Sequence, residues 1–151
     1  MKKLFLIITL IGAFISTSMA QSALNDKAES IIGTYSCKQG DDQFKAKITQ
    51  QKDGTFTGQI IWVEKDRDAN GNKILDTKNP DKNLRNTPCD QIVLFSGLQY
   101  NAKEKCWDGT KIYDPQRGIK AKVKVEFTDD GQLKLRGSIL GIGERVYWKK
   151  I

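Results

Sequence analysis

The chain has 151 residues, of which 25 are lysine or arginine, 18 are aspartate or glutamate and none is histidine, and its formal net charge at pH 7 is +7. Without histidine the chain has neither a Ser-His-Asp nor a Cys-His catalytic group, and it has no histidine-ligated zinc or copper site. These absences argue against a conventional hydrolase. The sequence therefore favours a protein that is not an enzyme and that needs no cofactor.

The N-terminal segment has the pattern of a secretory signal peptide. Lys2 and Lys3 precede an apolar run over residues 4–14, and the small residues Ser18 and Ala20 occupy the outer positions of a cleavage site. We expect residues 1–20 to be removed and the remaining chain to be exported, either to the periplasm or out of the cell. The apolar run is shorter than the roughly 18 residues of a membrane span, and no later stretch reaches that length, so no span is expected.

Cleavage after Ala20 would leave 131 residues, which is enough for one domain with its own core. This mature chain has 23 basic and 18 acidic residues, a net charge of +5. Such an excess favours contact with an anionic envelope surface, although a solvated lysine-rich surface is the simpler interpretation. Nucleic acid is not expected as a partner of an exported protein.

Three cysteines, Cys37, Cys89 and Cys106, would enter an oxidising compartment after export. They allow one disulfide with one thiol left over. The sequence does not choose among the three pairings.

The first segment of the mature chain covers residues 21–32. Leu24, Ala28 and Ile31 are spaced as on one face of a helix, and Ser22 is a suitable N-cap, so the pattern predicts one short amphipathic helix. Disorder is the alternative at this new N-terminus. From residue 33 to residue 151 apolar and polar residues alternate, which predicts a domain of β-strands.

The strands are separated by turn sequences. An Asp-Gly pair at residues 53–54 predicts a hairpin, and in the strand that follows Phe56, Gly58, Ile60 and Trp62 are expected to share one face. The most regular alternation covers residues 119–127. After a first strand that begins at residue 33, the predicted strands lie near residues 43–50, 55–64, 90–100, 105–113, 119–127, 133–139 and 144–150.

About eight strands joined in sequence by hairpins would leave two sheet edges bare unless the sheet closes on itself. The pattern therefore predicts an all-β fold, a single antiparallel up-and-down barrel of about eight strands. The interior of such a barrel is either filled by side chains or holds one small ligand. A two-sheet sandwich is the alternative architecture.

Several motifs resemble one bacterial family. The more specific ones are Asn-Pro-Asp-x-x-Leu-Arg at residues 79–85 and Ile-Tyr-Asp-Pro at residues 112–115, and Gly-Thr-Tyr at residues 33–35 accompanies them. Over nearly all of its mature length the chain is similar to the bacterial domain-of-unknown-function family 2147. The resemblance implies export and a lipocalin-like, or calycin, barrel. It supplies no agreed activity and no catalytic residues.

The lipocalin resemblance implies structural roles for three residues. Lipocalins carry Gly-x-Trp on the first strand, with the aromatic ring stacked under an arginine from the last strand. Gly33 and Tyr35 resemble the first pair and Arg145 resembles the arginine, so we expect a contact that seals one barrel end and contributes about 1 kcal/mol. Pro80 and Pro115 are expected to be structural because each fixes the backbone of its turn.

The long connection over residues 64–85 contains a partial metal-binding motif. Asp66, Asp68 and Asn70, followed by glycine, match the opening of an EF-hand calcium loop. The match then fails, because Lys73 stands where an apolar residue belongs and Thr77 where a bidentate glutamate belongs. An Asx turn at a hairpin tip is therefore the favoured interpretation, with these three residues as weak metal candidates.

The same connection carries Asp76, Asn79, Asp81 and Arg85. Connections of more than twenty residues in a compact domain are usually functional or disordered. In one interpretation Arg85 pairs with the neighbouring carboxylates and holds the loop over the barrel mouth. In the other, the loop is a lid that offers Arg85 or Asn79 to the polar head group of a ligand.

Four residues elsewhere are candidates for ligand contact if they lie at the same rim: Trp62, Trp107, Tyr113 and Arg117. Aromatic residues at strand positions more often belong to the core than to a ligand site. Together these features predict an exported lipocalin-like protein that binds a small, partly apolar molecule or an envelope component. The alternative is a structural or interaction protein of the envelope with a filled barrel, and an acid-base enzyme built on the loop carboxylates is a weaker third hypothesis.

Overall fold

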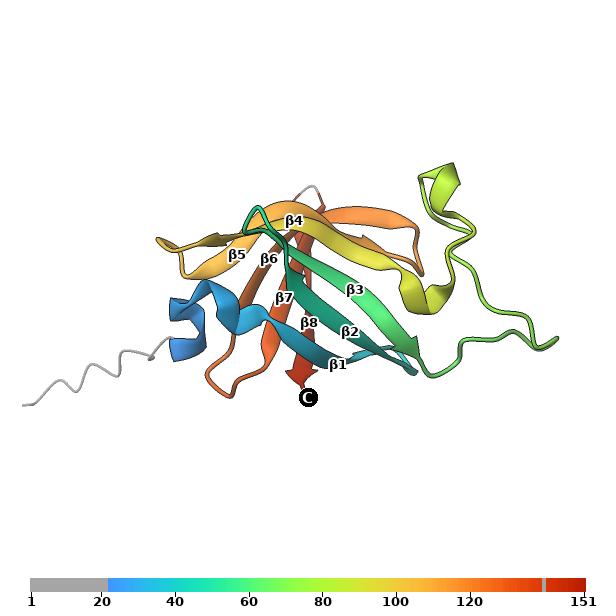
Figure 1. Ribbon diagram of the computed structural model, residues 1–151, viewed down its shortest axis with the longest axis horizontal. Coiled ribbons are helices and arrows are strands. Elements are labelled where there is room, and N and C mark those ends of the chain that lie inside the picture. The colour runs from blue at the N-terminus through green and yellow to red at the C-terminus, as the bar shows by residue number, and fades with distance from the viewer. Residues whose placement is uncertain (1–21, 140) are drawn as a thin grey trace, which may run out of the picture.

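The computed structural model describes residues 22–139 and 141–151, so the predicted signal peptide lies outside the described residues. Its eight antiparallel strands form a closed barrel in which each strand pairs with the next and β8 pairs back onto β1 (Figure 1). This confirms the predicted up-and-down barrel and excludes the sandwich. The strands are β1 (Gly33–Gln39), β2 (Asp42–Gln50), β3 (Phe56–Val63), β4 (Val93–Asn101), β5 (Cys106–Asp114), β6 (Ile119–Phe127), β7 (Leu133–Ile139) and β8 (Ile142–Lys150).

The helical elements are single 3₁₀ turns: η1 (Ala23–Asp26), η2 (Ala28–Ile31), η3 (Lys82–Leu84) and η4 (Cys89–Gln91). The N-terminal segment thus has two short helices instead of the single amphipathic helix that its spacing predicts. Lys27 separates them because its backbone is extended, with φ −131° and ψ 130°. The Ser22 side chain caps η1 as expected, accepting a 3.4 Å hydrogen bond from the Leu24 amide.

Asn25 of η1 ties this segment to one end of the barrel. Its side chain is 1% exposed and pairs with the backbone of Phe127, donating to the carbonyl at 2.9 Å and accepting from the amide at 2.7 Å. Its own carbonyl accepts a 2.6 Å hydrogen bond from the Tyr100 hydroxyl. The amide side chain therefore acts like one residue of an additional strand, and it continues the backbone pairing at the end of β6.

Aromatic side chains fill the same end of the barrel. Trp107 is fully buried, its ring centroid lies 5.2 Å from that of Tyr100 and 5.9 Å from that of Phe127, and its indole N–H donates to the Ala28 carbonyl at 3.1 Å. Tyr35 is also fully buried and donates its hydroxyl to the Ile31 carbonyl at 2.7 Å. Each aromatic polar atom thus finds a partner in the N-terminal segment, which closes this end.

The expected contact between Tyr35 and Arg145 is wrong. Tyr35 packs against Trp148, with ring centroids 6.2 Å apart, and the cation over its ring is Lys150, 6.0 Å from the centroid. Arg145 is exposed and lies opposite Arg136 of β7. Because side chains alternate along a strand, the position of Trp148 on the inner face places Arg145 on the outer face.

Trp62 also lies on the face opposite to the predicted one. The β2–β3 register passes from Ala46–Ile60 to Lys45–Trp62, so β3 contains one extra residue, Ile61, at a β-bulge. A single extra residue inverts the alternation that follows it. Trp62 is consequently 41% exposed, and Lys45 Nζ lies over its ring at 5.1 Å from the centroid.

The three cysteines are free in the structure: Cys37 and Cys106 are buried, and Cys89 is partly buried near the open end of the barrel. In the part of the chain that the structure describes, no helix has the length and apolarity needed to cross a membrane.

We expect Asn25→Ala to lower the free energy of unfolding by about 2–4 kcal/mol, because it leaves the buried amide and carbonyl of Phe127 without partners. Ser22→Ala is the matched control, since it removes an exposed, long capping bond from the same helix and is expected to change stability by less than about 1 kcal/mol. Urea unfolding measures both. Equal losses in the two variants would contradict the role given to Asn25.

Candidate ligand-binding cavity

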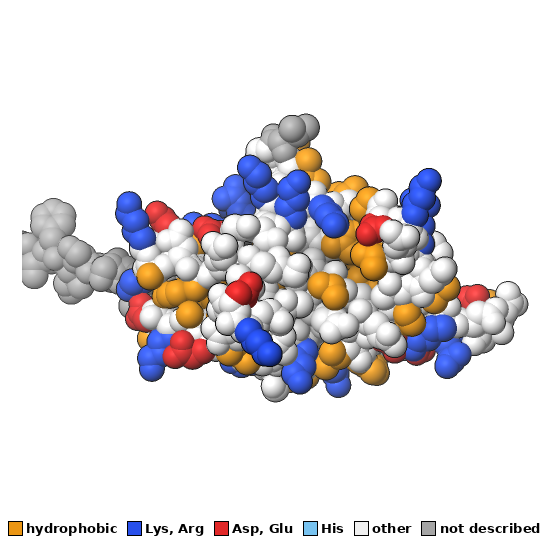
Figure 2. Space-filling view, turned by 45° about the horizontal axis from the view of Figure 1, so that its top comes forward, with side chains coloured by type: hydrophobic (Ala, Val, Ile, Leu, Met, Phe, Trp, Pro, Cys, Tyr) orange, Lys and Arg blue, Asp and Glu red, His pale blue; other side chains and the backbone are white. Residues whose placement is uncertain are grey.

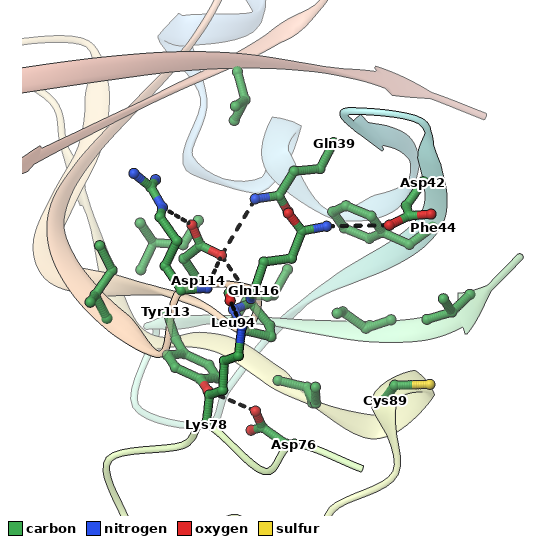
Figure 3. Close-up of a pocket in the computed structure, with 18 of the residues that line it drawn as sticks. Gln39, Asp42, Phe44, Asp76, Lys78, Cys89, Leu94, Tyr113, Asp114 and Gln116 are labelled. Carbon is green, nitrogen blue, oxygen red and sulfur yellow. Dashed lines mark hydrogen bonds and ion pairs between the residues drawn. The ribbon is translucent and has the colours of Figure 1, made fainter. Parts of the chain in front are cut away.

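A cavity of about 830 Å³ lies inside the barrel at the end away from η1 and η2. It is bordered by the β1–β2, β5–β6 and β7–β8 turns and by the long connection between β3 and β4, and Figure 3 labels side chains around it from the first two of these turns and from the connection. The barrel therefore has two unlike halves. The end covered by the N-terminal segment is filled with aromatic side chains, whereas the other end is hollow.

The inner wall of the cavity is apolar, and two of its positions carry small residues. Gly137 and Ala121 lie side by side on β7 and β6, where an added Cβ at position 137 would sit 3.5 Å from the Cβ of Ala121. Trp148 forms part of the floor between the filled and the hollow halves. The apolar wall residues are Phe44, Ile60, Val63, Ile92, Leu94, Ile112, Ala121, Leu135, Val146 and Trp148.

The mouth is charged, with both signs represented among the residues that line the cavity. The basic ones are Lys38, Lys65, Arg67, Lys78 and Arg117, and the acidic ones are Asp42, Asp76, Asp114 and Glu144. The cavity thus combines an apolar interior with a polar rim, which is the usual composition of a small-molecule site.

Arg117 links two elements of the rim. Its Nε donates to Asp114 at 2.6 Å, and its two terminal nitrogens donate to the two carboxylate oxygens of Glu144 at 3.0 and 2.6 Å. The hydrogen bonds to Glu144 and Asp114 raise the pKa of Arg117. Burial opposes the ionisation of Asp114, but the hydrogen bonds from Arg117 outweigh it and lower the pKa of that carboxyl. The guanidinium therefore fastens the β5–β6 turn to β8 by pairing with two carboxylates.

The long connection is folded over one side of the mouth, beside β5. Asp76 is 4% exposed, and its two carboxylate oxygens accept 2.7 Å hydrogen bonds from the Tyr113 hydroxyl and from the Asn79 side-chain amide. Figure 3 shows the Tyr113 ring directed toward Asp76 across the edge of the cavity. Burial, and then the hydrogen bond to Asp76, raise the pKa of Tyr113. The tyrosine therefore stays protonated and remains a donor to the carboxylate.

Lys78 makes the second attachment of this connection. Its ammonium group donates to the Gln116 carbonyl at 2.7 Å, and its backbone lies against Gly118. Gly118 has φ +66°, and a Cβ there would lie 2.4 Å from the Lys78 carbonyl oxygen. Glycine is thus required at position 118 both by the left-handed backbone and by the close approach of the connection.

Arg85 and Asp81 hold the connection internally. Arg85 Nε donates to the Asn79 carbonyl at 2.8 Å instead of pairing with a neighbouring carboxylate. Asp81 caps η3 by accepting a 2.9 Å hydrogen bond from the Asn83 amide. The predicted pairing of Arg85 with neighbouring carboxylates is therefore wrong for the described residues, and Arg85 instead joins two parts of the connection through a backbone carbonyl.

The residues of the EF-hand-like segment form a turn. The Asp68 carboxylate accepts 2.9 Å hydrogen bonds from the amides of Asn70 and Asn72, which is the expected Asx-type turn. Lys73 donates to Asp66 at 2.5 Å and to Asp90 at 2.6 Å, and its hydrogen bond lowers the pKa of Asp66. Among the described residues no group of three or more Cys, Asp or Glu side chains has the arrangement of a metal site.

The candidate residues thus separate into three groups. Asp76, Tyr113 and Arg117 line the cavity, and Asn79, Asp81 and Arg85 support the connection that carries Asp76. Trp62 lies on the outer face, and Trp107 fills the closed end. Of the two structural prolines, Pro115 borders the cavity and Pro80 follows the buried Asn79.

Sequence reasoning missed the contribution of the β1–β2 turn to the rim. Lys38, Gln39 and Asp42 all border the cavity, and Gln39 donates to Asp114 across the mouth at 3.4 Å. Phe44 is recognisable as inward-facing from its alternation. The turn itself carries no motif, because its position at the mouth follows only from closure of the barrel.

Tyr113→Phe should lower stability by about 1–3 kcal/mol, because the buried Asp76 carboxylate loses one of its two side-chain donors. It should also reduce the loss of stability at alkaline pH. A tyrosine whose folded pKa is raised contributes stability below its unfolded pKa of about 10, and this stability is lost as pH rises beyond that value. Urea unfolding at neutral and alkaline pH measures both effects, with the exposed Tyr147→Phe as control. Equal behaviour of the two variants would contradict the proposed role of the Tyr113 hydroxyl.

Gly118→Ala and Gly131→Ala form a matched pair for the attachment at Lys78. Both glycines have positive φ, +66° and +83°, but only the Cβ at position 118 meets another segment. Each variant should lose about 1–2 kcal/mol to backbone strain, and Gly118→Ala should lose more because it displaces Lys78. Hydrogen exchange should show faster amide exchange over residues 76–79 in Gly118→Ala alone. Unchanged exchange there would show that the connection does not depend on this contact.

Comparison with known proteins places the chain in a family. No curated protein matches it. Among solved structures, it is similar to protein HP1028 from the human pathogen Helicobacter pylori, described as belonging to the lipocalin family, with a TM-score of 0.62 and 24% sequence identity over 80% of this chain and 82% of that chain. This likeness concerns the fold.

The family model described as "Uncharacterized protein conserved in bacteria (DUF2147)" matches residues 33–150. The motifs at residues 33–35, 79–85 and 112–115 thus indicated the right family, and the chain belongs to DUF2147 and folds as a lipocalin-like barrel.

Proposed function

We propose that this protein binds a small, partly apolar molecule in the hollow half of the barrel. The observation that carries the proposal is the cavity of about 830 Å³, with its apolar wall and charged rim. Its volume falls within the range of about 300–1,000 Å³ that is usual for small-molecule sites. It also supports a binding protein over a barrel whose interior is filled by side chains.

The distribution of side-chain sizes supports the same proposal. Trp107 and Phe127 fill the closed half, whereas Ala121 and Gly137 occupy inner positions of neighbouring strands in the hollow half. Larger apolar side chains at those two positions would fill part of the cavity and contribute burial energy, about 0.8 kcal/mol for each methylene group. A chain that keeps small residues there gives up stability in favour of open volume.

The rim suggests which part of the ligand lies outermost. Arg117 pairs with Asp114 and Glu144, and Asp76 accepts from Tyr113, so these side chains are already held by neighbours within the rim. Gln39 and Gln43 are neutral side chains that also border the cavity, close to Lys38. We therefore favour a ligand with an apolar body and an outer polar group that accepts or donates hydrogen bonds at the β1–β2 turn.

Export is part of the proposal. The charged, apolar and small-residue sections of residues 1–20 support it, and an exported binding protein would meet its ligand in the envelope or outside the cell.

The proposal is tested by titration with N-phenyl-1-naphthylamine, an apolar dye whose fluorescence rises when it leaves water. Ala121→Phe places a ring inside the cavity and should weaken binding of the dye by about tenfold or more, equivalent to about 1.4 kcal/mol. Lys47→Phe adds the same side chain to the exposed outer face of β2 and should leave the affinity unchanged. Equal affinities of wild type and Ala121→Phe would show that the dye does not use the cavity, and absence of dye binding to the wild type would count against an apolar ligand.

A further inference from the structure

The outer face of β5–β8 carries a group of exposed cations, which we call the basic face. Its members are Lys111, Lys120, Lys122, Lys124, Arg136 and Arg145. The strand register aligns them in rows: Lys124 of β6 lies opposite Arg136 of β7, which lies opposite Arg145 of β8, and Lys111 of β5 lies opposite Lys122 of β6. Like charges directly opposite each other on neighbouring strands destabilise a sheet.

The structure does not offset this repulsion. Within residues 22–139 and 141–151, none of the six cations of the basic face forms an ion pair with an acidic side chain. Of the acidic residues around this face, Glu126 pairs with Lys134 and Glu144 pairs with Arg117, whereas Asp108 lies beside Lys111 and Lys122 without forming an ion pair. The face therefore carries six cations against one neighbouring carboxylate, and the like charges that lie opposite each other keep a cost in stability.

The basic face ends at an apolar edge of the cavity mouth. Ile139 and Ile142 flank the tip of the β7–β8 hairpin, are 41% and 79% exposed, and line the cavity together with Val146, which is 38% exposed. In Figure 2, Lys and Arg side chains gather close to this tip and apolar side chains are exposed beside them. Three features thus meet at one place: the cation rows, an exposed isoleucine tip and the opening of the cavity.

We propose that this surface docks the cavity mouth onto an anionic lipid bilayer. The cation rows would contact phosphate groups of the lipid head groups, and Ile142 would enter the boundary between head groups and acyl chains. A bilayer is favoured over a soluble polyanion because it offers negative charge and an apolar layer next to each other. A nucleic acid or an acidic polysaccharide would match the cations alone and would leave the isoleucine tip in water.

Docking goes beyond the binding proposal, because it places the mouth of the barrel against the membrane whatever the cavity holds. A partly apolar ligand could then pass between bilayer and cavity without crossing water. Either proposal can fail alone, since one is measured with a dye and the other with vesicles.

Flotation with vesicles tests the docking surface. The protein should bind vesicles that contain phosphatidylglycerol but not vesicles of phosphatidylcholine alone, and binding should weaken as salt screens the cation rows. Replacing the row with the triple variant Lys124→Gln, Arg136→Gln and Arg145→Gln should weaken binding by on the order of a hundredfold, since each basic residue near such a surface contributes about fivefold. The denaturation midpoint of this triple variant should be unchanged or higher than that of the wild type, because the repulsion between the like charges of the row is removed.

The matched control is the triple variant Lys47→Gln, Lys52→Gln and Lys103→Gln, which makes the same change in net charge at exposed positions away from the basic face. It should retain nearly full vesicle binding.

Ile142→Ser should weaken binding to the same vesicles by about tenfold through lost apolar burial. Failure to bind phosphatidylglycerol vesicles at low salt, or equal losses in the two triple variants, would overturn the docking surface. The docking surface would also be overturned if Ile142→Ser bound the vesicles as well as the wild type does and the wild type bound heparin as tightly as it binds the vesicles. That result would identify a soluble polyanion as the partner.

Discussion

The contact between the N-terminal segment and the barrel end is the constraint on which the rest of the structure depends. Asn25 completes the backbone pairing of Phe127, and the indole of Trp107 reaches the Ala28 carbonyl, so this end is closed by satisfied polar atoms and filled by rings. A barrel of eight strands has a limited interior. Once large aromatic side chains fill one half, the open volume lies in the other half, where Ala121 and Gly137 leave it unfilled.

The long connection shapes that open half without being a loose loop. Asp76 is held by Tyr113 and Asn79, and Lys78 rests on Gly118, so the segment lies along one side of the mouth with the buried Asp76 carboxylate paired. Its position at the mouth is set by contacts distant in sequence, and those contacts involve β5 and the turn that follows it. The mouth and the outer basic face share the β7–β8 hairpin, which relates the cavity to the proposed membrane surface.

The sequence predicts those features that follow from local pattern. The alternation over residues 119–127 and the turn sequences around it are enough to predict strands. Closure of the sheet into a barrel follows from the cost of leaving two sheet edges bare. Trp62 is mispredicted because a bulge at Ile61 inverts the alternation, and nothing in the local sequence marks that bulge. The partner of Asn25 lies 102 residues away, so no spacing rule finds it. The sequence names Asp76 and Tyr113 as candidates but does not pair them, since the two residues meet only after the barrel has closed.

The central claim is that the hollow half of the barrel is a site for a small molecule. It is tested most directly by native mass spectrometry of the protein purified from its own host, followed by spraying under denaturing conditions. We expect the native mass to exceed the mass of the processed chain by one small molecule, which is released on unfolding and is absent from a sample whose cavity has been filled by a larger side chain. A native mass equal to that of the bare chain, in repeated preparations from the host, would contradict the claim.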